Sequence, residues 1–212
     1  MVSMDPSLLD SLLRPFLAVP LQPADLAAIA DYLDLLLRWN AKINLTAVRE
    51  PNNIVTRHIG ESLFAAQCLL GSREATGRVI DFGSGAGFPG LPLRLYAPGI
   101  KLTLIESNQK KVAFLREAAR TMGFGNVDVF SGMAEDYTGR GDLVTMRAVE
   151  SFEASLSVAA GLMDRRDDAK LGLLIGMSQI ASARVTMAKL DWGDAIKVPE
   201  CASRVVLIGR RQ

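Results

Sequence analysis

The sequence predicts an α/β fold in which helices cover both faces of a mostly parallel sheet, with a helical cap at the N-terminus. From Gly77 onward, short apolar runs alternate with stretches of helical spacing, a pattern typical of strand–helix–strand units. Before residue 73, apolar residues recur at helical spacing. We therefore expect one domain over residues 1–212, made of a cap (1–72) and an α/β core (73–212).

The cap is predicted to contain three helices. A short one lies within residues 6–20, and a second runs from Pro23, which suits a first helical turn, to about Trp39. Residues 40–49 read as a loop, and a third helix is expected over 53–70.

The core is predicted to contain five strands of a largely parallel sheet, a closing antiparallel pair and the helices between them. Pro89 and Pro92 suit the first turn of a helix that follows the first strand. The expected strands are Val79–Phe82, Leu102–Ile105, Val127–Phe130, Leu143–Met146 and Leu171–Ile175, the pair is Ala195–Val198 with Arg204–Ile208, and the further helices are Gln109–Thr121, Ser151–Met163 and Gln179–Leu190.

The overall composition is that of an ordinary globular protein. The 24 basic and 23 acidic residues leave a net charge of +1, so a nucleic-acid site must be a local patch. Cys68 and Cys201 are too few and too separated for a disulfide scaffold, and no Cys/His cluster has metal-ligand spacing. No apolar stretch reaches the roughly 18 residues of a membrane helix, and no charged-then-apolar leader is present. We expect a cytoplasmic monomer that needs no metal and no membrane.

Residues 79–90, Val-Ile-Asp-Phe-Gly-Ser-Gly-Ala-Gly-Phe-Pro-Gly, predict a cofactor site. Four glycines after a buried strand indicate a tight turn whose backbone approaches a ligand, because only glycine takes positive φ without steric cost. A strand, a glycine turn and a helix N-terminus are typical of nucleotide-type cofactor sites.

Two cofactors compete for this turn. Gly85-x-Gly87-x-x-Gly90 fits the dinucleotide pattern and, with Glu106, would suit an NAD-dependent oxidoreductase. The pattern Asp81-x-Gly83-x-Gly85-x-Gly87 favours S-adenosylmethionine. There Asp81 can face the ammonium of the methionine moiety, whereas it would repel a pyrophosphate.

Ligands of such sheets bind beyond the carboxyl ends of the strands. Glu106, at the end of the second strand, can accept hydrogen bonds from two ribose hydroxyls, or is an ordinary surface acid. Residues 132–135, Gly-Met-Ala-Glu, could line an adenine. Arg147 ends another strand and could meet the cofactor or a phosphate, or form an internal salt bridge.

Two further features leave alternatives open. His58 is the only histidine, so imidazole acid–base catalysis would have to use it, although a structural role is the other interpretation. The expected helix Gln109–Thr121 carries a basic face that is either solvated or contacts RNA. That face comprises Asn108, Lys110, Lys111, Arg116 and Arg120.

Four segments together resemble a known family. They are Trp-Asn-Ala-Lys-Ile-Asn-Leu-Thr (39–46), Arg-His-Ile-Gly-Glu-Ser (57–62), Asp-Phe-Gly-Ser-Gly-Ala-Gly-Phe-Pro-Gly-Leu-Pro (81–92) and Arg-Ala-Val (147–149). From Leu35 to Ile208 the chain resembles the RsmG/GidB family, bacterial methyltransferases of a guanine N7 in small-subunit (16S) ribosomal RNA.

The resemblance implies a seven-stranded class I, Rossmann-like methyltransferase sheet that binds S-adenosylmethionine and acts on small-subunit ribosomal RNA or a 30S assembly particle. It implies cofactor contacts at Gly83, Phe88, Ala134, Glu135 and Arg147, and supports Glu106 for the ribose. It also implies that the polar residues Asn44, Thr46, Arg57 and His58 face the guanine or the RNA, and we expect catalytic roles for Arg147, Asn44 and His58.

Three positions depart from the family pattern. Gly132 and Ile175 stand where a basic residue is expected, and Glu150 replaces a small residue. These departures leave a non-catalytic, cofactor-binding ribosome-assembly protein as a third hypothesis. For the enzyme, we expect catalysis by alignment of guanine N7 with the methyl donor, because N7 keeps its lone pair at neutral pH.

Overall fold

The computed structural model describes residues 4–125 and 127–211. Within them, seven strands lie along one path in the order β3-β2-β1-β4-β5-β8-β6, and the short β7 pairs with β8. Strands β1 to β5 are parallel, and β8 runs antiparallel to β5, β6 and β7. The predicted mostly parallel sheet with an antiparallel closure is confirmed. The strands are β1 Thr76–Phe82, β2 Gly99–Glu106, β3 Val127–Ser131, β4 Leu143–Arg147, β5 Lys170–Gly176, β6 Leu190–Trp192, β7 Ile196–Lys197 and β8 Arg204–Arg211.

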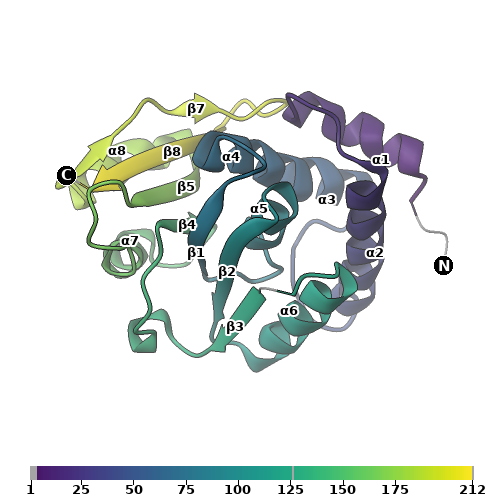
Figure 1. The fold of residues 1–212 in the computed structure, drawn as a ribbon, viewed down its shortest axis with the longest axis horizontal. Coiled ribbons are helices and arrows are strands. Elements are labelled where there is room, and N and C mark those ends of the chain that lie inside the picture. Colours follow the sequence, from purple (N-terminus) through teal and green to yellow (C-terminus); the bar gives the residue numbers. More distant parts are fainter. Residues whose placement is uncertain (1–3, 126, 212) are drawn as a thin grey trace.

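Helices cover both faces of the sheet (Figure 1). The N-terminal helices lie with α4 to α6 on one side, and α7 and α8 lie on the other. None of the helices described has the length and apolar character needed to cross a bilayer. The helices are α1 Pro6–Leu13, α2 Pro23–Asn40, α3 Pro51–Ile54, α4 Glu61–Leu70, α5 Gly90–Tyr96, α6 Gln109–Thr121, α7 Phe152–Gly161 and α8 Ile180–Thr186.

Successive residues of each central strand serve two different cores. Val79 and Leu104 pack into the core that also contains the N-terminal helices, whereas Ile80 and Ile105 pack against α7 and α8. This follows from the two-residue period of side chains along a strand. Strands that are apolar on both faces belong in the middle of such a layered fold.

The N-terminal helices pack directly against the α/β core. Trp39 on α2 donates its indole N–H to the Glu117 carboxylate on α6 at 3.0 Å and lies edge-on to Phe114. The Gln67 side chain on α4 donates to the carbonyl of Phe16 at 2.7 Å. Leu9, Tyr32 and Val79 share one buried cluster, so α1, α2 and the sheet are parts of one continuous core.

Two predicted helices differ in the structure. The helix expected to end at Leu190 ends at Thr186, and residues 190–192 form β6, because Leu190–Trp192 pairs with the far end of β8. The helix expected over 53–70 is interrupted by a π-helical turn, Val55–Gly60, between α3 and α4. π-helical turns are rare and frequently found at functional sites.

Candidate active site

The glycine turn after β1 follows a backbone route that requires glycine. Gly83, Gly85 and Gly87 have φ values of +66°, +55° and +91°, in the left-handed region that side chains disfavour. A Cβ on Gly90 would lie 2.5 Å from Leu104 Cδ2 and 2.9 Å from Asp81 Oδ2. The turn therefore needs glycine for its backbone conformation at three positions and for close packing against β1 and β2 at Gly90.

Asp81 lies behind this turn and not in front of it. Its side chain is fully buried, and Thr145 on β4 donates its hydroxyl to Asp81 Oδ1 at 2.8 Å. Burial raises the pKa of Asp81 to about 6. The neighbouring Phe82 lines the hollow above the sheet, so strand alternation points Asp81 away from it. The expected contact between Asp81 and a ligand ammonium stays a prediction, while in this structure the carboxylate is buried and bonded to Thr145.

A hollow of about 530 Å³ lies beyond the carboxyl ends of β1, β2 and β4. Glu106 is buried beside it, with Oε2 accepting the Gly85 backbone N–H at 3.0 Å and Oε1 accepting that of Asn108 at 2.8 Å. Each carboxylate oxygen has two acceptor sites, so Glu106 keeps acceptor capacity for a ligand. The predicted site residues Gly83, Glu106, Ala134 and Glu135 all line this hollow, with Lys111, Ala148 and Glu150.

A smaller hollow of about 210 Å³ adjoins the first. The two share Gly83, Lys111 and Ala148 in their walls. The smaller one brings together residues from all four segments of the family resemblance: Thr46, His58, Gly83, Gly85, Phe88 and Arg147. Gly87 lies within the same turn.

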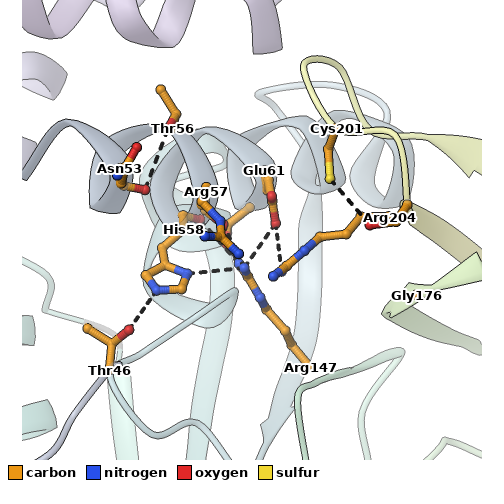
Figure 2. A network of polar contacts seen from close by, with 12 residues as sticks. Thr46, Asn53, Thr56, Arg57, His58, Glu61, Arg147, Gly176, Cys201 and Arg204 are labelled. Atoms are coloured by element: carbon orange, nitrogen blue, oxygen red, sulfur yellow. Dashed lines mark hydrogen bonds and ion pairs between the residues drawn. The ribbon is translucent and has the colours of Figure 1, made fainter. Parts of the chain in front are cut away.

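His58 is held in one tautomer (Figure 2). Its Nδ1 lies 3.1 Å from Nη2 of Arg147, and because a guanidinium only donates, Nδ1 accepts. Its Nε2 therefore carries the proton and donates to Thr46 Oγ1 at 2.7 Å. Burial, helped by the charge of Arg147, lowers the pKa of His58 to about 3. The ring is neutral at pH 7 and stacks on Phe88, with ring centroids 5.0 Å apart.

Arg147 forms an internal salt bridge and also lines the smaller hollow. Its Nη2 lies 2.9 Å from Glu61 Oε2 and donates to the Arg57 carbonyl at 2.6 Å. Figure 2 shows Glu61 between Arg147 and Arg204. Nη1 of Arg204 lies 3.0 Å from Glu61 Oε2. Arg57 belongs to the π-helical turn, so this turn supplies a carbonyl that accepts from the guanidinium. Burial lowers the pKa of Arg147 to about 10, so it stays charged at neutral pH.

Asn44 lies beside the site but lines neither hollow. It is exposed, and its side-chain oxygen accepts from Arg49 at 3.3 Å. Asn40 organises this loop, because its side-chain oxygen accepts the backbone N–H groups of Leu45 and Thr46 at 2.9 and 3.0 Å. Asn40 thereby fixes Thr46 against His58.

Tyr32 is a site-supporting residue that the sequence did not reveal. Its hydroxyl donates to the Ala86 carbonyl at 2.5 Å, and its ring lies edge-on to Phe88 with centroids 5.8 Å apart. In the sequence, Tyr32 lies among leucines at the core positions of a helix, so the sequence indicates only that it packs in the core. Only the fold shows that α2 supports the glycine turn.

Sequence comparison identifies the family. A family model described as "GidB: rRNA small subunit methyltransferase G" matches residues 25–171. The chain belongs to the GidB family. It is 45% identical over 134 residues to ribosomal RNA small subunit methyltransferase G from Stenotrophomonas maltophilia, covering 62% of the chain and 61% of that relative. It is 40% identical over 160 residues to the Xanthomonas euvesicatoria protein of the same name, covering 74% and 73%. The match thus spans about three fifths of the first relative's length.

Solved structures confirm the class I methyltransferase fold of this GidB family member. It is similar to magnesium protoporphyrin IX methyltransferase from Synechocystis, solved with bound S-adenosylmethionine (TM-score 0.64, 19% identity, 84% of this chain and 90% of that one). It is also similar to ribosomal protein L11 methylase from Lactobacillus delbrueckii (TM-score 0.62, 12% identity, 74% and 80%). At these identities the likeness concerns the fold.

Proposed function

We propose that this protein transfers a methyl group from S-adenosylmethionine to N7 of a guanine in small-subunit (16S) ribosomal RNA. The observation that carries the proposal is the pair of adjoining hollows that share Gly83, Lys111 and Ala148. The larger would hold the cofactor and the smaller would hold the guanine, so the two reactants meet at the shared wall. Family membership supports the substrate.

The larger hollow suits S-adenosylmethionine better than a dinucleotide. Glu106 offers ribose hydroxyls the carboxylate lone pairs that Gly85 and Asn108 leave free, and Ala134 gives an adenine a small neighbour. Three carboxylates, of Glu106, Glu135 and Glu150, line the hollow with the single cation Lys111. A pyrophosphate would meet those carboxylates, which disfavours NAD. We do not need Asp81 for this discrimination, because its carboxylate is buried and the three glutamates line the hollow themselves.

Bound S-adenosylmethionine supplies an already activated methyl group on a sulfonium. Guanine N7 has a lone pair at neutral pH, so the protein needs no general base. His58 cannot serve as one, because its Nδ1 accepts from Arg147 and its Nε2–H donates to Thr46. We infer that the residues of the smaller hollow orient the base and exclude water, which contributes through proximity and alignment.

We propose distinct roles for the three residues expected to be catalytic. Arg147 and His58 line the smaller hollow and would contact the guanine. Asn44 is exposed at the rim and would meet the RNA backbone instead. Asp81 would act as a positioning residue that ties the base of the glycine turn to β4 through Thr145.

We also propose a domain organisation, an oligomeric state and a cellular location for the protein. We infer that residues 1–212 fold as one domain, because the cap and the sheet share one buried cluster. We infer that the chain acts as a monomer in the bacterial cytoplasm, on small subunits or their assembly particles. Size-exclusion chromatography with light scattering tests the oligomeric state, and a single unfolding transition tests the single domain.

Two measurements test the proposed function. Calorimetric titration should show binding of S-adenosylmethionine and none of NAD. Labelled cofactor should transfer its methyl group to small subunits isolated from cells that lack this activity. Tight cofactor binding without transfer would favour the non-catalytic assembly protein, and NAD binding would favour the oxidoreductase.

A further inference from the structure

A third hollow, of about 370 Å³, lies between α2 and α6. The two helices pack against each other (Figure 1). We call this hollow the α2–α6 groove. Its walls carry Arg38, Trp39, Lys42 and Ile43 on one side and Lys110 and Glu117 on the other. Neither the glycine turn nor any residue assigned above to the cofactor or the guanine lines it.

The groove combines positive charge with an apolar, aromatic floor. Arg38, Lys42 and Lys110 form no ion pair with any carboxylate among the described residues, so their charges face solvent. The one carboxylate, Glu117, accepts the indole N–H of Trp39 and thereby fixes the ring. Proteins bind single-stranded nucleic acid with this combination, because the cations bind the phosphate and the base stacks on the aromatic ring.

The groove and the hollows of the active site also have walls on the same two segments of the chain. Lys110 lines the groove, and the next residue, Lys111, lines both hollows of the active site. On the opposite wall, Ile43 lines the groove and Leu45 lines the smaller hollow. The lining residues of the groove and of the hollows are thus one position apart on α6 and two positions apart on the opposite wall. Neighbouring Cα atoms are about 3.8 Å apart, so the two sites lie within a few ångströms of each other along the chain. An RNA strand leaving the smaller hollow would meet the groove next.

We propose that the α2–α6 groove binds a nucleotide of the RNA strand that flanks the target guanine. Its phosphate lies between Lys42 and Lys110, with Arg38 adding charge, and its base lies on the apolar floor. This inference rests on the proposed function, because it extends the path of the same RNA substrate. It also divides the basic face of α6 between its two interpretations. Lys110 and Lys111 face binding surfaces, whereas Arg116 and Arg120 are exposed and line none of these three hollows.

The test compares two triple variants of the full chain that each remove three positive charges. The groove variant is Arg38→Gln/Lys42→Gln/Lys110→Gln, and the control is Lys101→Gln/Arg116→Gln/Arg120→Gln, all at exposed positions. Binding of labelled 16S ribosomal RNA is measured across a salt titration, and cofactor affinity is measured by calorimetry. A charge-retaining variant, Lys42→Arg/Lys110→Arg, checks that charge and not local structure matters.

We expect the groove variant to bind the RNA about tenfold more weakly than the control, with unchanged cofactor affinity. The slope of log affinity against log salt should become shallower by about 0.7, since each single-strand phosphate contact contributes about that amount and the groove holds one phosphate. The charge-retaining variant should bind as the unaltered protein does. Equal RNA affinities and salt slopes for groove and control variants would overturn the proposal. Because binding needs no turnover, this result is independent of methyl transfer, whose absence in the unaltered protein would instead overturn the proposed function.

Discussion

Arg147 and Glu61 form a buried ion pair between the sheet and the cap. Arg147 Nη2 lies 2.9 Å from Glu61 Oε2, and each side chain is 5% exposed. Arg204 reaches the same oxygen from β8. The pair fixes a cation in the wall of the smaller hollow, because Glu61 and the carbonyls of the π-helical turn hold the guanidinium from the opposite side.

Replacing Glu61 should therefore destabilise the protein strongly. Glu61→Gln leaves two guanidinium groups without their carboxylate, and breaking a buried ion pair costs about 3–5 kcal/mol. Urea denaturation measures the free energy of unfolding. The control Asp10→Asn removes an exposed pair with Arg14 and should cost less than about 1 kcal/mol. Equal small losses in both variants would show that the Arg147–Glu61 pair is dispensable.

The neutral His58 should make the protein sensitive to acid. Its pKa is about 3 when folded and ordinarily about 6.5, so the unfolded chain takes up a proton in this window and the folded chain does not. Stability from His58 is therefore complete above pH 6.5 and is lost as pH falls toward 3.

The comparison with His58→Gln isolates this effect, because the opposing titration of Asp81 is present in both proteins. From pH 7 to pH 5, the unaltered protein should lose about 2 kcal/mol more of its unfolding free energy than His58→Gln does. Parallel stability–pH curves for the two proteins would refute the neutral, buried histidine.

Removing the Tyr32 hydroxyl should loosen the glycine turn. Tyr32→Phe keeps the ring against Phe88 but leaves the Ala86 carbonyl without its donor. We expect a loss of about 1–2 kcal/mol in stability and several-fold weaker binding of S-adenosylmethionine. Tyr96→Phe, at the end of α5, is the matched control and should change neither. Unchanged cofactor affinity in Tyr32→Phe would mean that α2 does not support the turn.

Glu106→Gln should weaken the binding of S-adenosylmethionine directly, in addition to any loss of fold stability. An amide can accept only one of the two backbone N–H groups that the carboxylate accepts from Gly85 and Asn108, and it offers a ribose less acceptor capacity. We expect the dissociation constant for S-adenosylmethionine to rise about tenfold or more by calorimetry. Glu150→Gln removes the same charge from the same hollow and should have a smaller effect. Equal effects would indicate that only net charge matters.

Much of the fold was predictable because its signals are local. Apolar runs such as Val79–Phe82 and the glycines after them specify a strand and a turn within a few residues, and the structure has both. β6 was missed because Leu190–Trp192 becomes a strand only through pairing with β8, whose residues lie at the end of the chain. The π-helical turn was missed because Val55–Gly60 has ordinary helical composition.

The sequence indicated several residues that line the candidate site, but not how their side chains contact one another. His58 and Arg147 do come together, yet no local pattern shows that Glu61 joins them to Arg204 across 143 residues of sequence. Asp81 was expected at the ligand, and the pattern of glycines and acid did not indicate that its carboxylate would be buried and bonded to Thr145. The roles of Tyr32 and Asn40 depend on how the cap packs, which no sequence pattern specified here.

The most direct test is to map the methyl group that this protein adds to 16S ribosomal RNA. Small subunits from cells lacking the activity are incubated with labelled S-adenosylmethionine, and the digested RNA is analysed for its modified nucleosides. The account predicts N7-methylguanine at a single position, and its loss in Arg147→Ala under conditions where that variant remains folded. Methylation of another atom or base, or no methylation despite cofactor binding, would contradict it.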